Sequence, residues 1–303
     1  MKLIIDTDPG IDDLMAIFTA MALPEIELVG LTTIFGNVTV ETATRNALRL
    51  VEMAGRDVPV AQGAAKPLAM PAITPSAHVH GAEGFGNIPA ETPKGTADSR
   101  DAADFIIDMA KAHPGELVLC PIGPLTNIAE AVTRAPEIAG MIKQVVIMGG
   151  SVDEGGNITP HAEANIYHDP HAANTVFAAD WEVVMIGLDV THRTLCTAED
   201  FAALKAAAPR IGGFIHEAAE FYLHFYTTVG KFDGASLHDP AALLACLYPE
   251  DFTLEEMRLR VVEEGEQIGA TVRDPEGGLV QAAMKVDAAR VQQRFMDAIK
   301  SWD

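Results

Sequence analysis

The sequence predicts one α/β domain spanning residues 1–303, built on an open, mostly parallel, Rossmann-like sheet with helices on both faces and a small antiparallel patch near the C-terminus. Apolar runs of strand length alternate with amphipathic stretches, and this alternation is typical of a parallel sheet covered by helices. Hydrophobic residues make up 49% of the 303 residues, enough for a large buried core. No change in composition, internal repeat or low-complexity segment marks a second domain.

The expected elements follow this alternation in order. Strands are expected at 2–5, 26–33, 58–61, 117–121, 144–148 and 182–188. Helices are expected near 12–22, 39–54, 98–112, 125–134, 170–179, 198–207, 212–229, 239–247 and 286–301. Strand-like runs near 257–263, 268–273 and 279–285 predict the antiparallel patch.

Residues 66–96 form the one long stretch without a clear period. They are rich in Pro, Gly, Ala and His, and a loop of this length in a compact domain is usually functional or mobile. Its Gly84-Phe85-Gly86 neither follows a clear strand nor leads at once into a helix. We therefore do not expect a phosphate-binding loop there.

Charge and cysteine content exclude several classes of function. The chain has 43 acidic and 21 basic residues and a formal net charge of −22, which argues against a nucleic acid or an anionic membrane surface as partner. Cys120, Cys196 and Cys246 are far apart and form no CxxC pair, so neither a disulfide framework nor a zinc ribbon is expected. The apolar start is too short for a signal peptide, and no apolar run approaches the roughly 18 residues of a membrane span. We therefore expect a cytoplasmic protein.

The opening of the chain carries the most informative local pattern. Directly behind the first strand, the run Asp6-Thr7-Asp8-Pro9-Gly10-Ile11-Asp12-Asp13 contains four carboxylates in eight positions. Anions this close repel one another, so we expect helix amides and a cation to neutralise them. Pro9-Gly10 supplies a turn into a helix whose positive end faces the acids. The alternative is that these residues only cap the helix and form a turn, without an ion.

Further polar clusters follow the later strands. They are Gly36-Asn37, the segment from Ile122 to Asn127, Gly149-Gly150, the segment from Asn157 to Asn165, and His238-Asp239-Pro240 ahead of a late helix. Loops at one sheet edge would bring their side chains together. A lining of amides and carboxylates suits a polyhydroxyl ligand oriented by a cation. A hard cation is expected rather than zinc, because no Cys or close His pair accompanies the acids.

The acidic run resembles the signature of the inosine/uridine-preferring nucleoside hydrolases. Five further segments occur in the order and spacing of that family: Thr32-Thr33-Ile34-Phe35-Gly36-Asn37, Gly123-Pro124-Leu125-Thr126-Asn127, Met148-Gly149-Gly150, Asp189-Val190-Thr191-His192 and His238-Asp239-Pro240. The resemblance covers nearly the whole chain. It implies hydrolysis of the N-glycosidic bond of ribonucleosides to free base and ribose, with Ca²⁺ as cofactor and a homodimer or homotetramer as the assembly.

The resemblance also implies roles for individual residues. Asp8, Asp13, Asp239 and the main-chain carbonyl of Ile122 would bind the calcium ion, which would hold the attacking water and the ribose 2′ and 3′ hydroxyls. Asp8 would be the general base, and His238 the acid that protonates the departing base. The substrate contacts implied by the family are Asp12, Asn37, His80, Met148, Asn157, Glu163, Asn165, Tyr226 and Asp239.

Two features limit what the resemblance implies. Ala164 stands where family members commonly have an aromatic residue, so part of the wall near the 5′ hydroxyl or the base is expected to be missing. Tyr222 and Tyr226 lie on an expected helix near the base pocket, but they do not distinguish a purine from a pyrimidine preference.

Two other functions share part of this pattern with the nucleoside hydrolases. A haloacid dehalogenase-like phosphatase also begins with a strand and Asp-x-Asp, but it has Thr or Val where Gly10 stands here. A calcium-dependent ribose- or nucleoside-binding protein on the same scaffold would bind without turnover, and no substitution in the catalytic set favours it.

Overall fold

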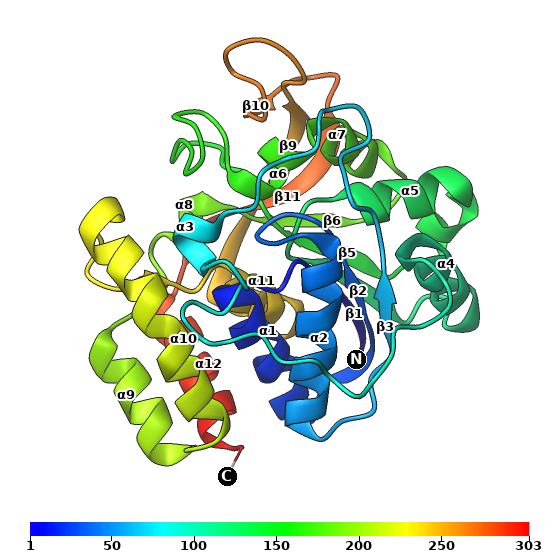
Figure 1. Cartoon of the computed structure of the whole chain (residues 1–303). Helices are drawn as coiled ribbons and strands as arrows, with labels where there is room; N and C mark the ends of the chain where they lie inside the picture. Colours follow the sequence, from blue (N-terminus) through cyan, green and yellow to red (C-terminus); the bar gives the residue numbers. More distant parts are fainter. Residues whose placement is uncertain (303) are drawn as a thin grey trace.

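The computed structural model, which describes residues 1–302, contains a nine-stranded mixed sheet in the order β10-β9-β11-β6-β5-β4-β1-β2-β3 (Figure 1). The seven strands from β11 to β3 run parallel, β9 is antiparallel to β11, and β10 is antiparallel to β9. The strands are β1 (Lys2–Thr7), β2 (Glu27–Thr33), β3 (Val60–Gln62), β4 (Leu117–Pro121), β5 (Gln144–Met148), β6 (Val183–Ile186), β9 (Phe252–Val261), β10 (Thr271–Arg273) and β11 (Gly278–Val286). A separate antiparallel pair joins β7 (Leu195–Cys196) to β8 (Ala235–Ser236).

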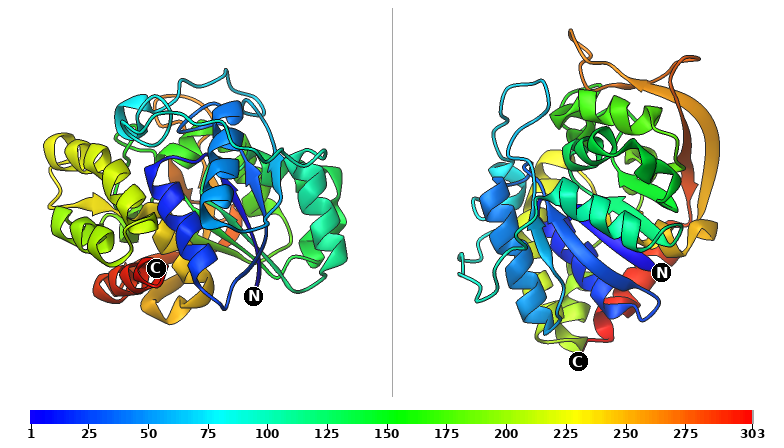
Figure 2. Two further views of the ribbon diagram at one scale, coloured as in Figure 1. Left: turned by 60° about the horizontal axis from the view of Figure 1, so that its bottom comes forward. Right: turned by 90° about the vertical axis from the view of Figure 1, so that its right-hand side faces the viewer.

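Helices cover both faces of this sheet (Figure 2). The long helices are α1 (Ile11–Ala22), α2 (Val40–Ala54), α4 (Ala102–Ala112), α5 (Thr126–Arg134), α7 (Pro170–Ala178), α9 (Ala198–Ala207), α10 (Ile211–Phe225), α11 (His238–Leu247) and α12 (Ala288–Lys300). The short helices are α3 (Ala77–His80), α6 (Ala164–His168) and α8 (Leu188–Thr191), together with η1 (Pro136–Gly140), η2 (Tyr226–Gly230) and η3 (Pro249–Asp251).

The side chains of β1 show how the two faces are filled. Leu3 and Ile5 point into one core cluster, which packs on α1, α2, α10, α11 and α12, whereas Ile4 points into a second cluster under α4, α5 and α7. This alternation follows from the two-residue period of a strand. Since both faces are covered, the central strands are apolar throughout, which is why their sequence shows continuous apolar runs.

The predicted fold class is confirmed, and the strand and helix positions agree with the expected ranges to within a few residues for most elements. The expected helix 98–112 was wrong at its start, because Asp101 accepts a hydrogen bond from the Asp104 amide and caps a helix that begins at Ala102. The expected helix 212–229 ends at Phe225 and continues as the π-helical turn η2.

The C-terminal strands extend the main sheet and form its antiparallel part, as expected. β11 pairs in parallel with β6, and β9 starts at Phe252, five residues earlier than the range 257–263 expected from the sequence. The first half of β9 escaped prediction because its exposed neighbours Glu255 and Glu256 interrupt the alternation of apolar and polar residues. No helix within residues 1–302 is long and apolar enough to span a membrane.

We predict that Gly30→Ala destabilises the fold. A Cβ at Gly30 in β2 would overlap the ring of Phe105, which is fully buried on α4, so the free energy of unfolding should fall by about 1–3 kcal/mol. Denaturant titration measures the change. Gly140→Ala is the matched control, because a Cβ there meets no atom within 4 Å, and it should change stability by less than about 0.5 kcal/mol. Equal stability of the two variants would contradict this packing.

Candidate active site

A cavity of about 560 Å³ opens at the carboxyl edge of the parallel strands. Eleven of the residues predicted from the sequence line it: Asp12, Asn37, His80, Ile122, Met148, Asn157, Glu163, Asn165, Tyr226, His238 and Asp239. Asp8 and Asp13 are fully buried and are not among the lining residues. The structure therefore brings all thirteen predicted residues to one region, with two of them behind the cavity wall.

Asp13 is held by the backbone turn between β1 and α1. Its Oδ1 accepts hydrogen bonds from the Thr7 hydroxyl (2.5 Å) and the Asp8 amide (3.2 Å). Its Oδ2 accepts from the Gly10 amide (2.9 Å) and from Asn37 Nδ2 (3.0 Å). Asp13 thus caps α1 at the N3 position. Helix capping, the alternative considered from the sequence, accounts for this acid.

Capping does not account for Asp8. Its Oδ2 accepts a hydrogen bond of 2.6 Å from the Asn37 amide, while its Oδ1 is buried and has no hydrogen-bond partner. A Cβ on Gly36 would overlap Oδ2, and a Cβ on Gly123 would lie 2.6 Å from Oδ1. The two glycines of the neighbouring loops therefore leave just enough room for this carboxylate. A buried, unpaired carboxylate oxygen normally requires a partner.

Asp12, Asp13 and Asp239 form a group whose carboxylate oxygens lie within 4.8 Å of one another. Asp239 comes from the first turn of α11, so acids that are distant in sequence meet here. Burial, and then repulsion from Asp13, raise the pKa of Asp12 to about 8. Burial raises the pKa of Asp239 well above its usual range, with repulsion from Asp12 adding to the effect.

This donor set fits a hard cation. Every charged ligand atom is a carboxylate oxygen, and Asp8 Oδ1 and Asp12 Oδ1 are buried without hydrogen-bond partners. Burial raises the pKa of Asp8 as well, followed by repulsion from Asp13. A divalent ion would supply the missing positive charge. The three acids whose oxygens lie close together include Asp12, which the resemblance assigned to the ribose. They do not include Asp8, which the resemblance assigned to the metal.

The N-cap and first turn of α6 supply two further polar side chains that line the cavity. Glu163 caps α6 through bonds from the amides of Asn165 (2.8 Å) and Ile166 (3.0 Å), and its Oε2 also accepts from the Gly150 amide (2.9 Å). Asn165 Nδ2 donates to the Ile122 carbonyl (2.9 Å) and to the Met148 carbonyl (3.1 Å). Asn165, a predicted substrate contact, thus orients the Ile122 carbonyl, which was predicted to bind the ion.

Asn157 and Ala164 complete this side of the cavity. Asn157 Oδ1 accepts a hydrogen bond of 3.0 Å from the Ala164 amide, and both residues line the cavity together with Gly156 and Ile158. Because Ala164 carries only a methyl group, the wall at this point is formed by small and aliphatic residues rather than by an aromatic ring.

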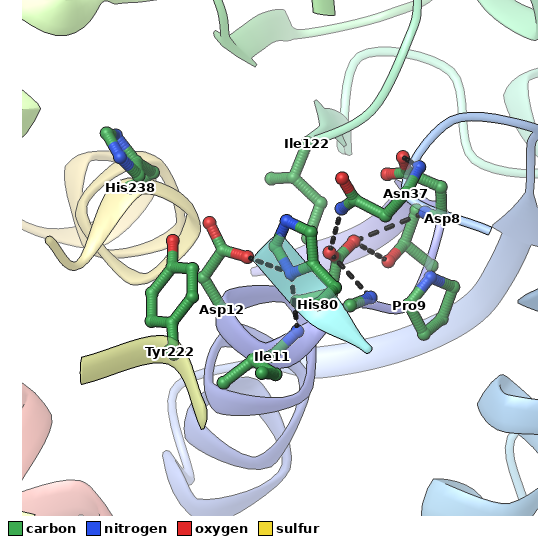
Figure 3. Close-up of polar contacts among 12 residues, drawn as sticks. Asp8, Pro9, Ile11, Asp12, Asn37, His80, Ile122, Tyr222 and His238 are labelled. Atoms are coloured by element: carbon green, nitrogen blue, oxygen red, sulfur yellow. Dashed lines mark hydrogen bonds and ion pairs between the residues drawn. The ribbon is translucent and has the colours of Figure 1, made fainter. Parts of the chain in front are cut away.

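His80 lies over the start of α1 (Figure 3). Its Nδ1 accepts a hydrogen bond of 3.1 Å from the Ile11 amide, so a neutral ring carries its proton on Nε2. Burial lowers the pKa of His80 to about 3, with a smaller contribution from His78. The 3.8 Å separation of Nδ1 from Asp12 Oδ1 is therefore not an ion pair, and His80 offers a neutral donor.

His238 begins α11 and is held on both ring nitrogens. Nε2 is 2.6 Å from the Tyr226 hydroxyl, and Nδ1 is 2.7 Å from the Thr191 hydroxyl. Burial lowers the pKa of His238 well below its usual range, and His192 adds to the effect. Figure 3 shows His238 and Tyr222 across from Asp12, and Tyr222 lowers the pKa of Asp12 against the larger effect of burial.

Comparison with known proteins decides the family. The model of the family described as inosine-uridine preferring nucleoside hydrolase matches residues 3–293. The chain belongs to this family. A probable uridine nucleosidase 2 from Arabidopsis thaliana is 40% identical over 98% of this chain and 97% of its own length. An inosine-uridine preferring nucleoside hydrolase from Crithidia fasciculata is 38% identical over 99% of this chain and 97% of its own length.

Solved structures agree with this nucleoside hydrolase in fold. A plant nucleoside hydrolase superposes with a TM-score of 0.96 at 35% identity, covering 99% of this chain and 98% of that one. A purine-preferring ribonucleoside hydrolase from Gardnerella vaginalis superposes with a TM-score of 0.95 at 36% identity, covering 100% and 99%. The predicted family, fold class and enzyme class, a nucleoside N-ribohydrolase, are confirmed, and the phosphatase alternative is wrong.

Sequence reasoning missed several residues of this hydrolase site. The cavity is also lined by His78, His192, Phe225, Val229 and Phe232, which give the end near His238 an aromatic and apolar character. Periodicity predicted 225–229 only as part of a helix, and it gave no sign of a cavity wall. His192 was visible within the Asp189-Val190-Thr191-His192 motif, to which the sequence analysis attached no role.

We predict that removing divalent cations makes stability fall as pH rises from about 6.5 to 8. A carboxyl group with a raised folded pKa stabilises the protein below its unfolded pKa, and this stabilisation is lost as pH rises through the folded value. The loss begins above the unfolded pKa of about 4 and ends at the folded value, so Asp6, whose pKa burial raises to about 7, and Asp12 near 8 complete it within this window. Burial lowers the pKa of His80 and His238, so these rings are neutral in the folded protein throughout the window. Their unfolded forms lose their remaining charge between about pH 6.5 and 7.5, which opposes the fall by only about 0.4 kcal/mol per ring.

Thermal unfolding with excess chelator and with millimolar Ca²⁺ measures this effect. In chelator, the free energy of unfolding should fall on the order of 1 kcal/mol per titrating carboxyl, and Ca²⁺ should raise the melting temperature more at pH 8 than at pH 6.5. A chelated protein whose stability is flat or rises across this range would contradict the buried acidic cluster.

Proposed function

We propose that the protein catalyses calcium-dependent hydrolysis of the N-glycosidic bond of ribonucleosides, releasing free base and ribose. The observation that supports this most strongly is the buried, unpaired Oδ1 of Asp8 behind a cavity floored by Asp12 and Asp239. A carboxylate kept free of hydrogen bonds beside other carboxylates suits a base that acts on water at a cation site.

Asp8, Asp13, Asp239 and the Ile122 carbonyl are the proposed calcium ligands. When bound, Ca²⁺ would lower the pKa of a coordinated water and orient the ribose 2′ and 3′ hydroxyls. Asp13 is already fixed by four donors, and Asn165 orients the Ile122 carbonyl. These protein contacts preform the ligand geometry.

Asp8 then acts as the general base. The Asn37 amide holds Oδ2, so the free Oδ1 is the atom that receives a proton from the attacking water. The water oxygen forms a bond to C1′ of the ribose while the C1′–N bond to the base breaks. No covalent intermediate with the protein is required.

The cavity is suited to the charge that develops on the sugar. Cleavage gives the ribose oxocarbenium character, which anionic and oxygen-rich surroundings stabilise. Asp12 and Glu163 line this part of the cavity. The proposed ribose contacts are Asp12, Asn37, Asn157, Glu163 and Asn165, with Met148 packing beneath the sugar.

The opposite end of the cavity would receive the base. The departing base needs a proton or a hydrogen bond, and His238 with Tyr226 provides one such donor pair 2.6 Å apart. His80, a neutral ring with its proton on Nε2, provides a second donor. Aromatic and apolar residues around them accept a flat ring without selecting a hydrogen-bond pattern.

The resemblance and the family membership also support three wider proposals. We propose that residues 1–303 form one domain, that the protein is cytoplasmic, and that it assembles as a homodimer or homotetramer. Relatives that match 97% or more of their own length to this chain support the first of these.

We predict that Asp8→Asn abolishes most turnover. The amide cannot accept the proton from water, so kcat for uridine and inosine should fall about 10²- to 10⁴-fold. A reducing-sugar assay measures ribose release, and circular dichroism checks that the fold is retained. Near-native rates in a folded variant would remove Asp8 from the mechanism.

We predict that His238→Ala affects substrates according to their leaving group. The loss should be large for uridine and inosine, about 10²-fold or more, and small for p-nitrophenyl riboside, whose leaving group needs no proton. Comparison of kcat on the two kinds of substrate tests this directly. Equal losses on both would assign His238 a structural role.

A further inference from the structure

The turn α8, between β6 and β7, contacts two separate parts of the active site. It carries Asp189 and Thr191 of a motif to which the mechanism above gives no role. The Leu188 amide donates to the Gly150 carbonyl (3.0 Å), and the Thr194 carbonyl just after the turn accepts from the Leu237 amide (2.8 Å). The turn is therefore tied both to the loop after β5 and to the start of α11.

Thr191 contacts the catalytic histidine from behind. Its hydroxyl lies 2.7 Å from His238 Nδ1, and Thr191 is fully buried and does not line the cavity. The other ring nitrogen, Nε2, is 2.6 Å from the Tyr226 hydroxyl, which does line it. The two hydroxyls together fix the rotation of the imidazole, with Thr191 on the buried side of the ring and Tyr226 on the side that lines the cavity.

Asp189 holds the loop that carries the sugar contacts. Its Oδ2 accepts from the Val152 amide (2.8 Å), and its Oδ1 accepts from the amides of Asp153 (2.8 Å) and Glu154 (3.1 Å). Three hydrogen bonds from consecutive amides to one buried carboxylate are charge-assisted and strong. This loop continues into Asn157, which lines the cavity.

We propose that α8 is a positioning element of the hydrolase, in which Thr191 orients His238 towards the leaving base and Asp189 orients the Asn157 loop towards the ribose. The proposal rests on the proposed function. Since the two residues are only two positions apart on one rigid turn, a single piece of backbone sets the distance between the leaving-group donor and the sugar contacts. Each residue acts through another side chain or loop, and neither needs to touch the substrate.

A purely structural role predicts a different result. If the Thr191 hydroxyl only satisfied a buried nitrogen, its loss would lower stability and would change the turnover of all substrates alike. A positioning role instead predicts a loss that depends on whether the leaving group needs a proton. The substrates uridine, inosine and p-nitrophenyl riboside separate these outcomes.

The first arm compares Thr191→Val, Thr191→Ser and Thr194→Val. Thr191→Val keeps the shape of the side chain and removes its hydroxyl, so kcat for uridine and inosine should fall about five- to tenfold, the value of one hydrogen bond. Its KM values, and its kcat on p-nitrophenyl riboside, should stay within about twofold of the wild type. Thr191→Ser restores the hydroxyl and should recover most of the lost rate.

Thr194→Val is the matched control. Thr194 is also fully buried, and its hydroxyl donates to the Thr191 carbonyl (3.0 Å) without contacting His238. The variant loses a buried hydroxyl from the same segment, so it reports the cost of that loss alone. Thr194→Val should lower the melting temperature, but the ratio of kcat on uridine or inosine to kcat on p-nitrophenyl riboside should stay the same as in the wild type.

The second arm uses Asp189→Asn, which weakens the three amide contacts. Because the Asn157 loop then loses its position, KM should rise about tenfold for uridine, inosine and p-nitrophenyl riboside alike. A third arm combines Thr191→Val with His238→Ala. If Thr191 acts only through His238, the double variant should be no slower on uridine than His238→Ala alone.

The outcomes separate this proposal from the function on which it rests. A wild-type protein that releases no ribose from any of the three substrates would overturn the proposed function, and with it this inference. An active wild type with Thr191→Val unchanged on uridine, or slowed equally on uridine and p-nitrophenyl riboside, would overturn the positioning role alone. Additive losses in the double variant would also overturn it.

Discussion

The mutual repulsion of buried aspartates is the constraint on which the rest of this structure depends. Asp8, Asp12, Asp13 and Asp239 all lie behind or on the floor of one cavity, and burial raises the pKa of each. Burying like charges is costly unless donors and a cation compensate. The start of α1, the Thr7 hydroxyl and Asn37 supply donors for part of this charge. Asp8 Oδ1 and Asp12 Oδ1 remain buried without hydrogen-bond partners, and they carry charge that the proposed ion would offset.

The fold brings these acids together by topology. β1 lies inside the sheet between β2 and β4, so the loop after β1 is flanked by those that carry Asn37 and Ile122. The helix α11, which packs against α1, then brings Asp239 from a distant part of the sequence. Glycines at positions 36 and 123 leave room for Asp8 where any larger residue would displace it. Stability is provided by the two apolar clusters, whereas this edge is arranged for chemistry.

The central part of the fold could be predicted from the sequence because its signals are local. Apolar runs marked the parallel strands, and the acidic run marked the main site. The short helices α6 and α8 escaped prediction because each is too short for a hydrophobic period. Glu163 caps α6, whereas Asp189 in α8 accepts amides of a loop that is distant in sequence. The link between Thr191 and His238 spans 47 positions of sequence. Such a contact depends on tertiary packing, so residue spacing alone cannot reveal it. Asp13 both caps α1 and belongs to the acidic group. Helix capping and ion binding were treated as alternatives from the sequence, but this residue is placed for both.

The central claim is that these aspartates share one divalent ion. The most direct measurement is a crystal structure grown with Ca²⁺, with anomalous diffraction used to locate the metal. We expect one ion between Asp8, Asp13, Asp239 and the Ile122 carbonyl, at the distances of about 2.3–2.6 Å that calcium requires. A catalytically active crystal form with no ion between these groups, or with the ion bound elsewhere, would contradict the account.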